Sequence, residues 1–176
     1  MTAKLFWFTG LSGAGKTTIG QLFCSRLKTS NQSTVFLDGD VMRGIFDYSQ
    51  KYLPLERKKI AMTYSRLCKM LTVQGIDVVI ATISMFHEVR DWNRQNIDNY
   101  KEIYIKVPIE VLIEKDQKGL YSRALRGEVE HVVGFEAKGE AEVEEPKNPD
   151  IVIVNDRSET PKFIVDHLIN DLKLNI

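Results

Sequence analysis

The sequence carries a glycine-rich segment of the kind that binds phosphate groups. Residues 10–17 read Gly-Leu-Ser-Gly-Ala-Gly-Lys-Thr and fit the pattern G-x-x-x-x-G-K-[ST]. Glycines let such a loop curl so that its backbone N–H groups point inward at phosphate oxygens. The helix that follows directs the positive end of its dipole at the same anion. We therefore expect a nucleoside triphosphate site here.

Two side chains at the end of this segment have further chemistry. Lys16 can reach the terminal phosphates, and the hydroxyl of Thr17 can ligate Mg²⁺, the expected cofactor. The guanine-binding signature N/T-K-x-D of GTPases does not occur in the chain. The residues expected to contact the nucleotide, with ATP as co-substrate, are Gly10, Leu11, Ser12, Gly13, Ala14, Gly15, Lys16, Thr17 and Thr18.

A second acidic motif, Asp38-Gly39-Asp40, follows a short apolar run. Ligands of open α/β sheets bind at the carboxyl ends of the strands, where this motif is expected to lie. Two carboxylates there can orient an attacking hydroxyl or hold Mg²⁺ through water. The simpler alternative is a turn with a helix N-cap. Arg43 and Arg57 are candidate anion clamps, because arginine pairs bidentately with phosphate or sulfate, although each could also be an ordinary surface charge.

Strand and helix patterns alternate along the chain, which predicts an α/β fold. Short apolar and β-branched runs indicate strands, and apolar residues at helical spacing indicate helices between them. We expect a doubly wound, three-layer α/β sandwich, with a parallel sheet of about five strands and helices on both faces. The expected strands are 4–9, 34–37, 77–83, 102–107 and 151–154. The expected helices are 17–28, 54–74, 88–100, one from Pro108, and one that Thr160-Pro161 begins.

Residues 119–149 depart from this alternation, with weak periodicity, basic residues early and acidic residues late. A long stretch of this kind inside a compact domain is usually functional or disordered. It is either a mobile lid over the site or a solvated surface excursion. We interpret residues 1–176 as one domain, with a lid at about 117–148.

Composition excludes several other classes of protein. The 176 residues include 24 basic and 24 acidic ones, and this zero net charge argues against broad binding to nucleic acid or membrane. The cysteines, Cys24 and Cys68, lack metal-ligand spacing, and no apolar run is long enough to span a bilayer. We expect a cytoplasmic protein with small-molecule nucleotide partners, no nucleic acid and no membrane. The oligomeric state stays open, with a homodimer as one candidate.

Several motifs together resemble the adenylylsulfate kinase family. They are GLSGAGKTT, LDGD-x-x-R, ISMFHEVR, KDQKGLYSRALRGEVE and PKNPD, and the correspondence runs from residue 4 to about residue 156. The segment KGLY…A…GE is far more distinctive of that family than the phosphate loop. The resemblance implies an ATP-dependent kinase that transfers the γ-phosphate to the ribose 3′-hydroxyl of adenylylsulfate. It also implies the three-layer sandwich of P-loop kinases, in which residues 119–149 are the lid.

The resemblance assigns roles to individual residues. It implies that Asp40 is the base or orienter for the 3′-hydroxyl and that Asp38 lies near Mg²⁺. Arg43 and Arg57 grip the acceptor, and Lys118 enters from the lid. Ser84 occupies the position of a serine that is phosphorylated in some members, although a serine after a strand is also a common helix cap.

The sequence departs from the family pattern mainly on the acceptor side. His87 ends the run ISMFH where the family has I-S-P-Y-R, and it either binds an acceptor phosphate or is a surface histidine. Ile60 replaces a usual asparagine. Of two phenylalanines that commonly sandwich the adenine, one corresponds to Tyr52, which can still stack, and the other to Val132, with Phe135 as a displaced substitute.

None of these departures falls in the residues expected to bind ATP. This suggests that the acceptor differs from that of the family. A pyrimidine needs less stacking surface than adenine, and cytidine diphosphoramidate keeps both the 3′-hydroxyl and the mixed-anhydride tail. Adenylylsulfate and the cytidine compound both stay candidates. The alternative to a kinase is a non-catalytic, regulatory nucleotide-binding protein, and acceptor-dependent release of ADP separates the two.

Overall fold

The computed structural model describes residues 3–30, 33–48, 53–129, 132–134 and 143–174. Its centre is a five-stranded sheet in the order β2-β3-β1-β4-β5, and every pairing is parallel. This arrangement confirms the predicted α/β fold with a parallel sheet. The strands are β1 (Leu5–Thr9), β2 (Thr34–Asp38), β3 (Asp77–Ala81), β4 (Tyr100–Lys106) and β5 (Ile151–Val154).

Strand β1 is the central strand, and its side chains alternate between two cores. Phe6 and Phe8 pack in the cluster on one face of the sheet, and Leu5 and Trp7 pack in the cluster on the other. All four are fully buried. The continuous apolar run that predicts this strand therefore reflects burial on both faces.

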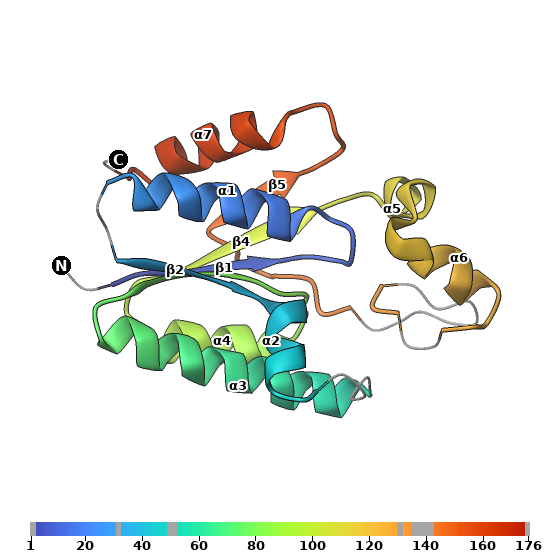
Figure 1. Ribbon diagram of the computed structural model, residues 1–176, viewed down its shortest axis with the longest axis horizontal. Helices are drawn as coiled ribbons and strands as arrows, with labels where there is room; N and C mark the ends of the chain where they lie inside the picture. The colour runs from blue at the N-terminus through green and yellow to red at the C-terminus, as the bar shows by residue number, and fades with distance from the viewer. Residues whose placement is uncertain (1–2, 31–32, 49–52, 130–131, 135–142, 175–176) are drawn as a thin grey trace.

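Helices cover both faces of the sheet, as Figure 1 shows. Helices α1 (Lys16–Lys28) and α7 (Pro161–Asp171) pack on one face, and α3 (Pro54–Val73) and α4 (His87–Asn96) pack on the other. The side chain of Thr160 accepts a hydrogen bond from the Phe163 backbone N–H at 3.3 Å, which confirms the predicted start of the last helix. Among the described residues, no helix is both long and apolar enough to cross a membrane.

Four elements differ from the sequence prediction: α4, β4, β3 and a short helix after β2. Helix α4 ends at Asn96, and Tyr100 begins β4 instead of ending a helix, because it pairs with Leu5 of β1. A short helix, α2 (Gly39–Ile45), follows β2 directly, where the sequence indicated only a possible helix cap. Strand β3 ends at Ala81, two positions before the predicted boundary.

The segment that is expected to form a lid contains more structure than its weak periodicity predicts. After α5 (Ile109–Lys115) come a 3₁₀ turn (Gln117–Gly119) and helix α6 (Leu120–Leu125), which lie beside the main layers in Figure 1. Residues with positive φ divide this region into short pieces that carry little helical periodicity: Asp116, Lys118 and Gly119. A separate small apolar cluster holds the pieces together, formed by Leu112, Tyr121, Ala124 and Val132.

Candidate active site

The phosphate loop follows β1 at the carboxyl end of the sheet, and its first glycine is required by close packing. Gly10 has φ of 150°, and a Cβ there would lie 2.4 Å from the carbonyl oxygen of Ile105 in β4. Gly15, with φ of 96°, is the residue directly before α1. Only glycine adopts these conformations at little cost, so the loop can pass next to β4 and turn sharply into the helix.

Three other parts of the chain hold the backbone of this loop. The Nδ2 of Asn155, after β5, donates to the Ala14 carbonyl at 2.8 Å. The hydroxyl of Tyr121, in α6, donates to the Ser12 carbonyl at 3.0 Å, and Lys115 lies 3.4 Å from the Gly13 carbonyl. Because carbonyl oxygens accept these bonds, the contacts fix the loop without using its N–H groups. Sequence reasoning missed Asn155 and Tyr121, although Asn155 follows a strand at the ligand-binding edge.

Lys16 is a nearly buried cation within the loop. Its side chain is 9% exposed, and its ammonium donates to the Leu11 carbonyl at 2.7 Å. Burial lowers the pKa of Lys16 to about 8, while the charges of Asp40 and Asp38 act in the opposite direction. An ammonium has three N–H donors, so this arrangement leaves capacity for phosphate oxygens.

Asp38 connects the phosphate loop to the start of α2. Its Oδ2 accepts a hydrogen bond from the Thr17 hydroxyl at 2.7 Å. Its Oδ1 accepts from the backbone N–H groups of Asp40 at 2.9 Å and Val41 at 3.2 Å, which makes it the N-cap of α2. The cap that the sequence offered as an alternative is therefore present, and the same carboxylate also faces the nucleotide loop. Asp40 is exposed in the first turn of α2.

The oxygens of Thr17 and Asp38 fit a Mg²⁺ ion. Mg²⁺ prefers hard oxygen ligands and is usually bound by one or two protein groups together with water and substrate phosphates. In the part of the chain that the structure describes, no group of three or more His, Cys, Asp or Glu residues gathers into a cage. Thr17 and Asp38 would hold the ion, which would neutralise charge on the phosphates of the nucleotide.

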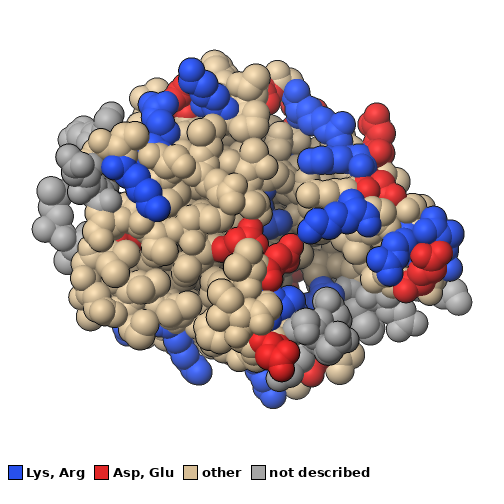
Figure 2. All heavy atoms as spheres, viewed as in Figure 1, with Lys and Arg blue, Asp and Glu red and all other residues tan. Residues whose placement is uncertain are grey.

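Helices α2 and α3 carry several of the residues that are expected to bind the acceptor. Arg43 and Arg57 are both half-buried, and Nη1 of Arg43 donates to the Tyr48 carbonyl at 3.2 Å. The Tyr64 hydroxyl donates to the Gly39 carbonyl at 3.2 Å, which ties the two helices together, and burial raises its pKa to about 12. Figure 2 shows basic and acidic side chains gathered on the side of the molecule where α2 and the lid helices lie.

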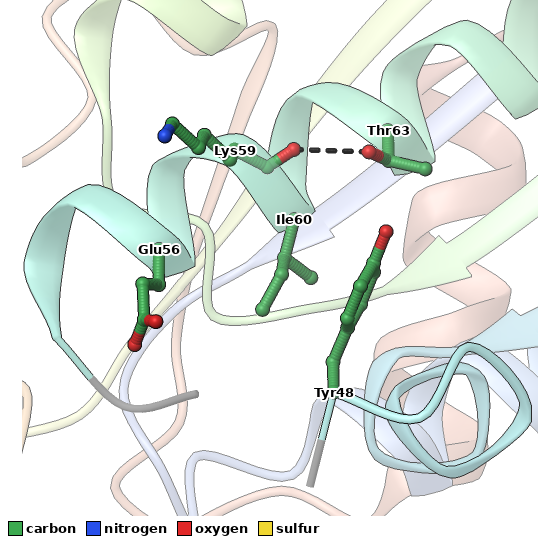
Figure 3. Close-up of a pocket in the computed structure, with 5 residues that line it drawn as sticks. All are labelled: Tyr48, Glu56, Lys59, Ile60 and Thr63. Atoms are coloured by element: carbon green, nitrogen blue, oxygen red, sulfur yellow. Dashed lines mark hydrogen bonds between the residues drawn. The ribbon is translucent and has the colours of Figure 1, made fainter. Parts of the chain in front are cut away.

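A pocket of about 220 Å³ opens between α3 and the segment after α2 (Figure 3). The ring of Tyr48 and the side chain of Ile60 face one another across it. Phe46 stacks on Tyr48 with ring centroids 5.9 Å apart. The sequence analysis identified Ile60 as a departure from the family pattern but did not identify Tyr48, because the two residues come together only in the fold. The residues that line the pocket are Tyr48, Glu56, Lys59, Ile60 and Thr63.

The loop between β3 and α4 lies at the same edge of the sheet. The Thr9 hydroxyl, next to the phosphate loop, donates to the Ile83 carbonyl at 2.6 Å. Ser84 is 6% exposed with φ of 27°, and its Oγ has no hydrogen-bond partner among the described residues. His87 begins α4 and is half-buried, and its backbone N–H donates to the carboxylate of Glu144.

The remaining predicted residues lie in or near the lid. Lys118 is exposed in the 3₁₀ turn, whereas Val132 is 5% exposed and packs inside the lid cluster. Contact of either residue with an acceptor stays a prediction. Tyr52, Phe135 and part of the lid at 117–148 lie outside the described residues.

The fold and this site define a P-loop kinase, with a parallel sheet, a phosphate-binding loop after its central strand, and an aspartate beside the loop threonine. The family model described as adenylylsulphate kinase matches residues 2–154, and the chain belongs to that family. It is therefore a kinase that uses ATP and an alcohol group as acceptor.

Individual relatives divide between two acceptors. The chain is 39% identical to the cytidine diphosphoramidate kinase of Campylobacter jejuni over 170 residues, 97% of this chain and 96% of the relative. It is 32% identical to the adenylyl-sulfate kinase of Deinococcus deserti over 170 residues, 95% and 92% of the two chains. The structure of the Mycobacterium tuberculosis APS kinase CysC in complex with AMPPNP and APS aligns with a TM-score of 0.87, at 27% identity and 98% coverage of both chains.

Proposed function

We propose that this kinase transfers the γ-phosphate of ATP to the ribose 3′-hydroxyl of a nucleotide with a mixed-anhydride tail, and that cytidine diphosphoramidate is its preferred acceptor. The observation that carries the reaction is the contact between Thr17 and Asp38, beside Lys16 and Asp40. This cluster supports the proposal, because one ammonium group and two carboxylates lie together at one edge of the sheet. The expected partners are small nucleotides. The expected location is the cytoplasm, where ATP is available.

The proposed chemistry is an in-line transfer. The 3′-oxygen forms a bond to the γ-phosphorus, the bond to the β–γ bridging oxygen breaks, and ADP leaves. The proton of the 3′-hydroxyl goes to Asp40, which is exposed and next to the capping Asp38. Lys16 and the loop N–H groups hold the transferred phosphate, so catalysis is mostly positioning and charge neutralisation.

The acceptor preference has separate support. The ISMFH segment and Ile60 differ from the family pattern at positions expected to face the acceptor. The phosphate loop, in contrast, matches its full pattern. The pocket between Tyr48 and Ile60 offers one aromatic ring and one aliphatic wall, which suits a small base. A relative that shares 39% identity over almost the whole chain is named for the cytidine compound.

The test is release of ADP with Mg·ATP and a small panel of acceptors. The panel contains cytidine diphosphoramidate, adenylylsulfate and the 3′-deoxy form of each. We expect turnover with the cytidine compound and none with the 3′-deoxy controls, because these lack the attacking oxygen. Turnover with adenylylsulfate alone would overturn the acceptor preference. Turnover that persists with the 3′-deoxy compounds would overturn transfer to the 3′-hydroxyl.

A further inference from the structure

We propose that Arg90 is a positioning residue that holds the imidazole of His87 in its neutral form with hydrogen on Nε2, so that His87 donates one hydrogen bond to the anionic tail of the acceptor. This inference rests on the proposed function, because it concerns the acceptor side of the same site. It adds a residue, Arg90, and a protonation state that the kinase reaction alone does not specify.

The geometry around Arg90 determines which ring nitrogen carries the hydrogen. Arg90 lies one helical turn after His87 in α4 and is 3% exposed. Its Nη2 lies 2.7 Å from Nδ1 of His87. A guanidinium group only donates hydrogen bonds, so Nδ1 must accept with its lone pair. The hydrogen of a neutral imidazole then sits on Nε2.

Arg90 is itself held by several partners, which makes it a rigid support. Its Nε lies 3.3 Å from the carboxylate of Glu102 in β4, a side chain that is 4% exposed. Its Nη1 lies 3.4 Å from the Ser84 carbonyl, and its Nη2 also donates to the Glu144 carbonyl. The guanidinium therefore joins α4, β4, the loop after β3 and the segment that returns from the lid.

The charges around His87 favour the neutral ring. Burial lowers the pKa of His87, and the nearby cations Arg90 and Lys147 lower it further, whereas Glu144 and Asp91 act in the opposite direction. The Glu144 carboxylate also accepts the backbone N–H of His87. The net direction is downward, which agrees with the hydrogen-bond pattern that Arg90 imposes.

The remaining donor of His87 suits an anionic oxygen. Within the described ranges, Nε2 has no hydrogen-bond partner, and the side chain is half-buried and not enclosed. The loop that precedes His87 accepts a hydrogen bond from Thr9, next to the phosphate loop, so His87 lies at the ligand-binding edge of the sheet. A phosphate, sulfate or phosphoramidate oxygen can accept this single N–H.

The first experiment reads the protonation state directly. Two-bond ¹H–¹⁵N correlation spectra of the ¹⁵N-labelled full-length protein at pH 7.5 distinguish the two neutral forms from the imidazolium. The chain has three histidines, so the His87→Gln variant identifies the His87 signal. We expect hydrogen on Nε2 alone. Hydrogen on Nδ1, or a protonated ring at this pH, would overturn the proposal whether or not the acceptor is correct.

The second experiment tests the role of the donor. His87→Ala should raise the KM for the acceptor by about 10-fold, the usual effect of losing a hydrogen bond to a charged group, with little change in kcat or in the KM for ATP. His87→Gln should recover most of this loss, because its amide N–H can replace Nε2–H. An unchanged acceptor KM in His87→Ala, while the wild-type enzyme turns over, would reject the inference and leave the proposed function standing.

The third experiment tests Arg90. Arg90→Lys keeps a cation opposite Glu102 but loses the planar fork that reaches Nδ1. In the folded variant we expect the His87 signal to shift to a mixture of neutral forms, together with a higher acceptor KM. An unchanged His87 spectrum in folded Arg90→Lys would remove the positioning role. If this variant does not fold, the wild-type spectrum still decides the protonation state.

Discussion

Lys16 is nearly buried, and burial disfavours the positive charge that the side chain needs to bind phosphate. Burial lowers its pKa to about 8, and the carboxylates Asp40 and Asp38 offset part of that effect. An ammonium with a reduced hydration shell interacts strongly with phosphate, because it gives up little water on binding. The Lys16 ammonium also donates one hydrogen bond to the Leu11 carbonyl, so one of its N–H groups is already paired.

Lys16→Ala should abolish measurable turnover, with a loss of at least about 100-fold, since removing one stabiliser of transition-state charge commonly costs that much. The fold should persist, because the variant removes a desolvated charge and leaves the glycines of the loop in place. Rates of ADP release and a thermal melt followed by circular dichroism check both parts. Near-normal activity in the folded variant would contradict the assignment of the phosphate loop.

Asp38 has a structural and a chemical role, and one substitution separates them. The variant Asp38→Asn can still cap α2, because asparagine caps helices about as well as aspartate. This variant loses the negative charge beside Thr17, so the Mg²⁺ concentration needed for half-maximal rate should increase. Initial rates against Mg²⁺, together with urea unfolding, test this. Unchanged Mg²⁺ dependence would argue that Asp38 does not hold the ion.

At the scale of elements, the turn from β1 into α1 depends on close contact with β4. The loop passes so near the end of β4 that a Cβ at Gly10 would overlap the backbone oxygen of Ile105. Gly44 in α2 provides a contrast, because nothing lies within 4 Å of the place where its Cβ would be. The same residue type is therefore required at one position and replaceable at the other.

Gly10→Ala should lower the free energy of unfolding by about 1–3 kcal/mol, since both the backbone strain and the overlap must be relieved. It should also weaken ATP binding, because the loop must move. The matched variant Gly44→Ala should raise the free energy of unfolding by about 0.5–1 kcal/mol, because alanine favours a helix over glycine. Urea unfolding and ATP titrations compare the two. Equal effects in both variants would show that the contact with Ile105 is unimportant.

At the scale of the whole molecule, residues far apart in sequence meet at the carboxyl edge of the sheet. The loop after β5 supplies Asn155 to the phosphate loop, and α6 supplies Tyr121. Asp38, the last residue of β2, comes from the other side of the sheet. The site is therefore assembled by the order of the strands, and each strand end contributes a different group.

Asn155→Ala should lower the free energy of unfolding by about 1–3 kcal/mol, because it leaves the Ala14 carbonyl without this donor. ATP binding should weaken as well, since one support of the loop is lost. Asn148→Ala is a suitable control, because Asn148 is exposed and Arg94 binds its backbone oxygen and not its side chain. Calorimetric ATP titrations and urea unfolding check the difference. Similar behaviour of the two variants would show that Asn155 does not support the loop.

The parallel α/β fold and the nucleotide loop could be predicted from the amino-acid sequence. Both follow from local chemistry: apolar runs such as Leu5–Thr9 signal buried strands, and the glycine, lysine and threonine of the loop are consecutive. The Thr160 cap was also predictable, because a cap needs only its own first turn.

The assembly of the rest of the site could not be predicted from local sequence patterns. Asn155 reaches the loop, Tyr48 faces Ile60, and Arg90 joins His87 to Glu102 because distant segments of the chain pack together. Helix α2 is too short for a clear periodic pattern, and it forms on the cap that Asp38 provides while Tyr64 of α3 holds its first residue. Local patterns report neighbours along the chain, whereas these contacts depend on the order of the strands and on the burial of groups that are far apart in sequence.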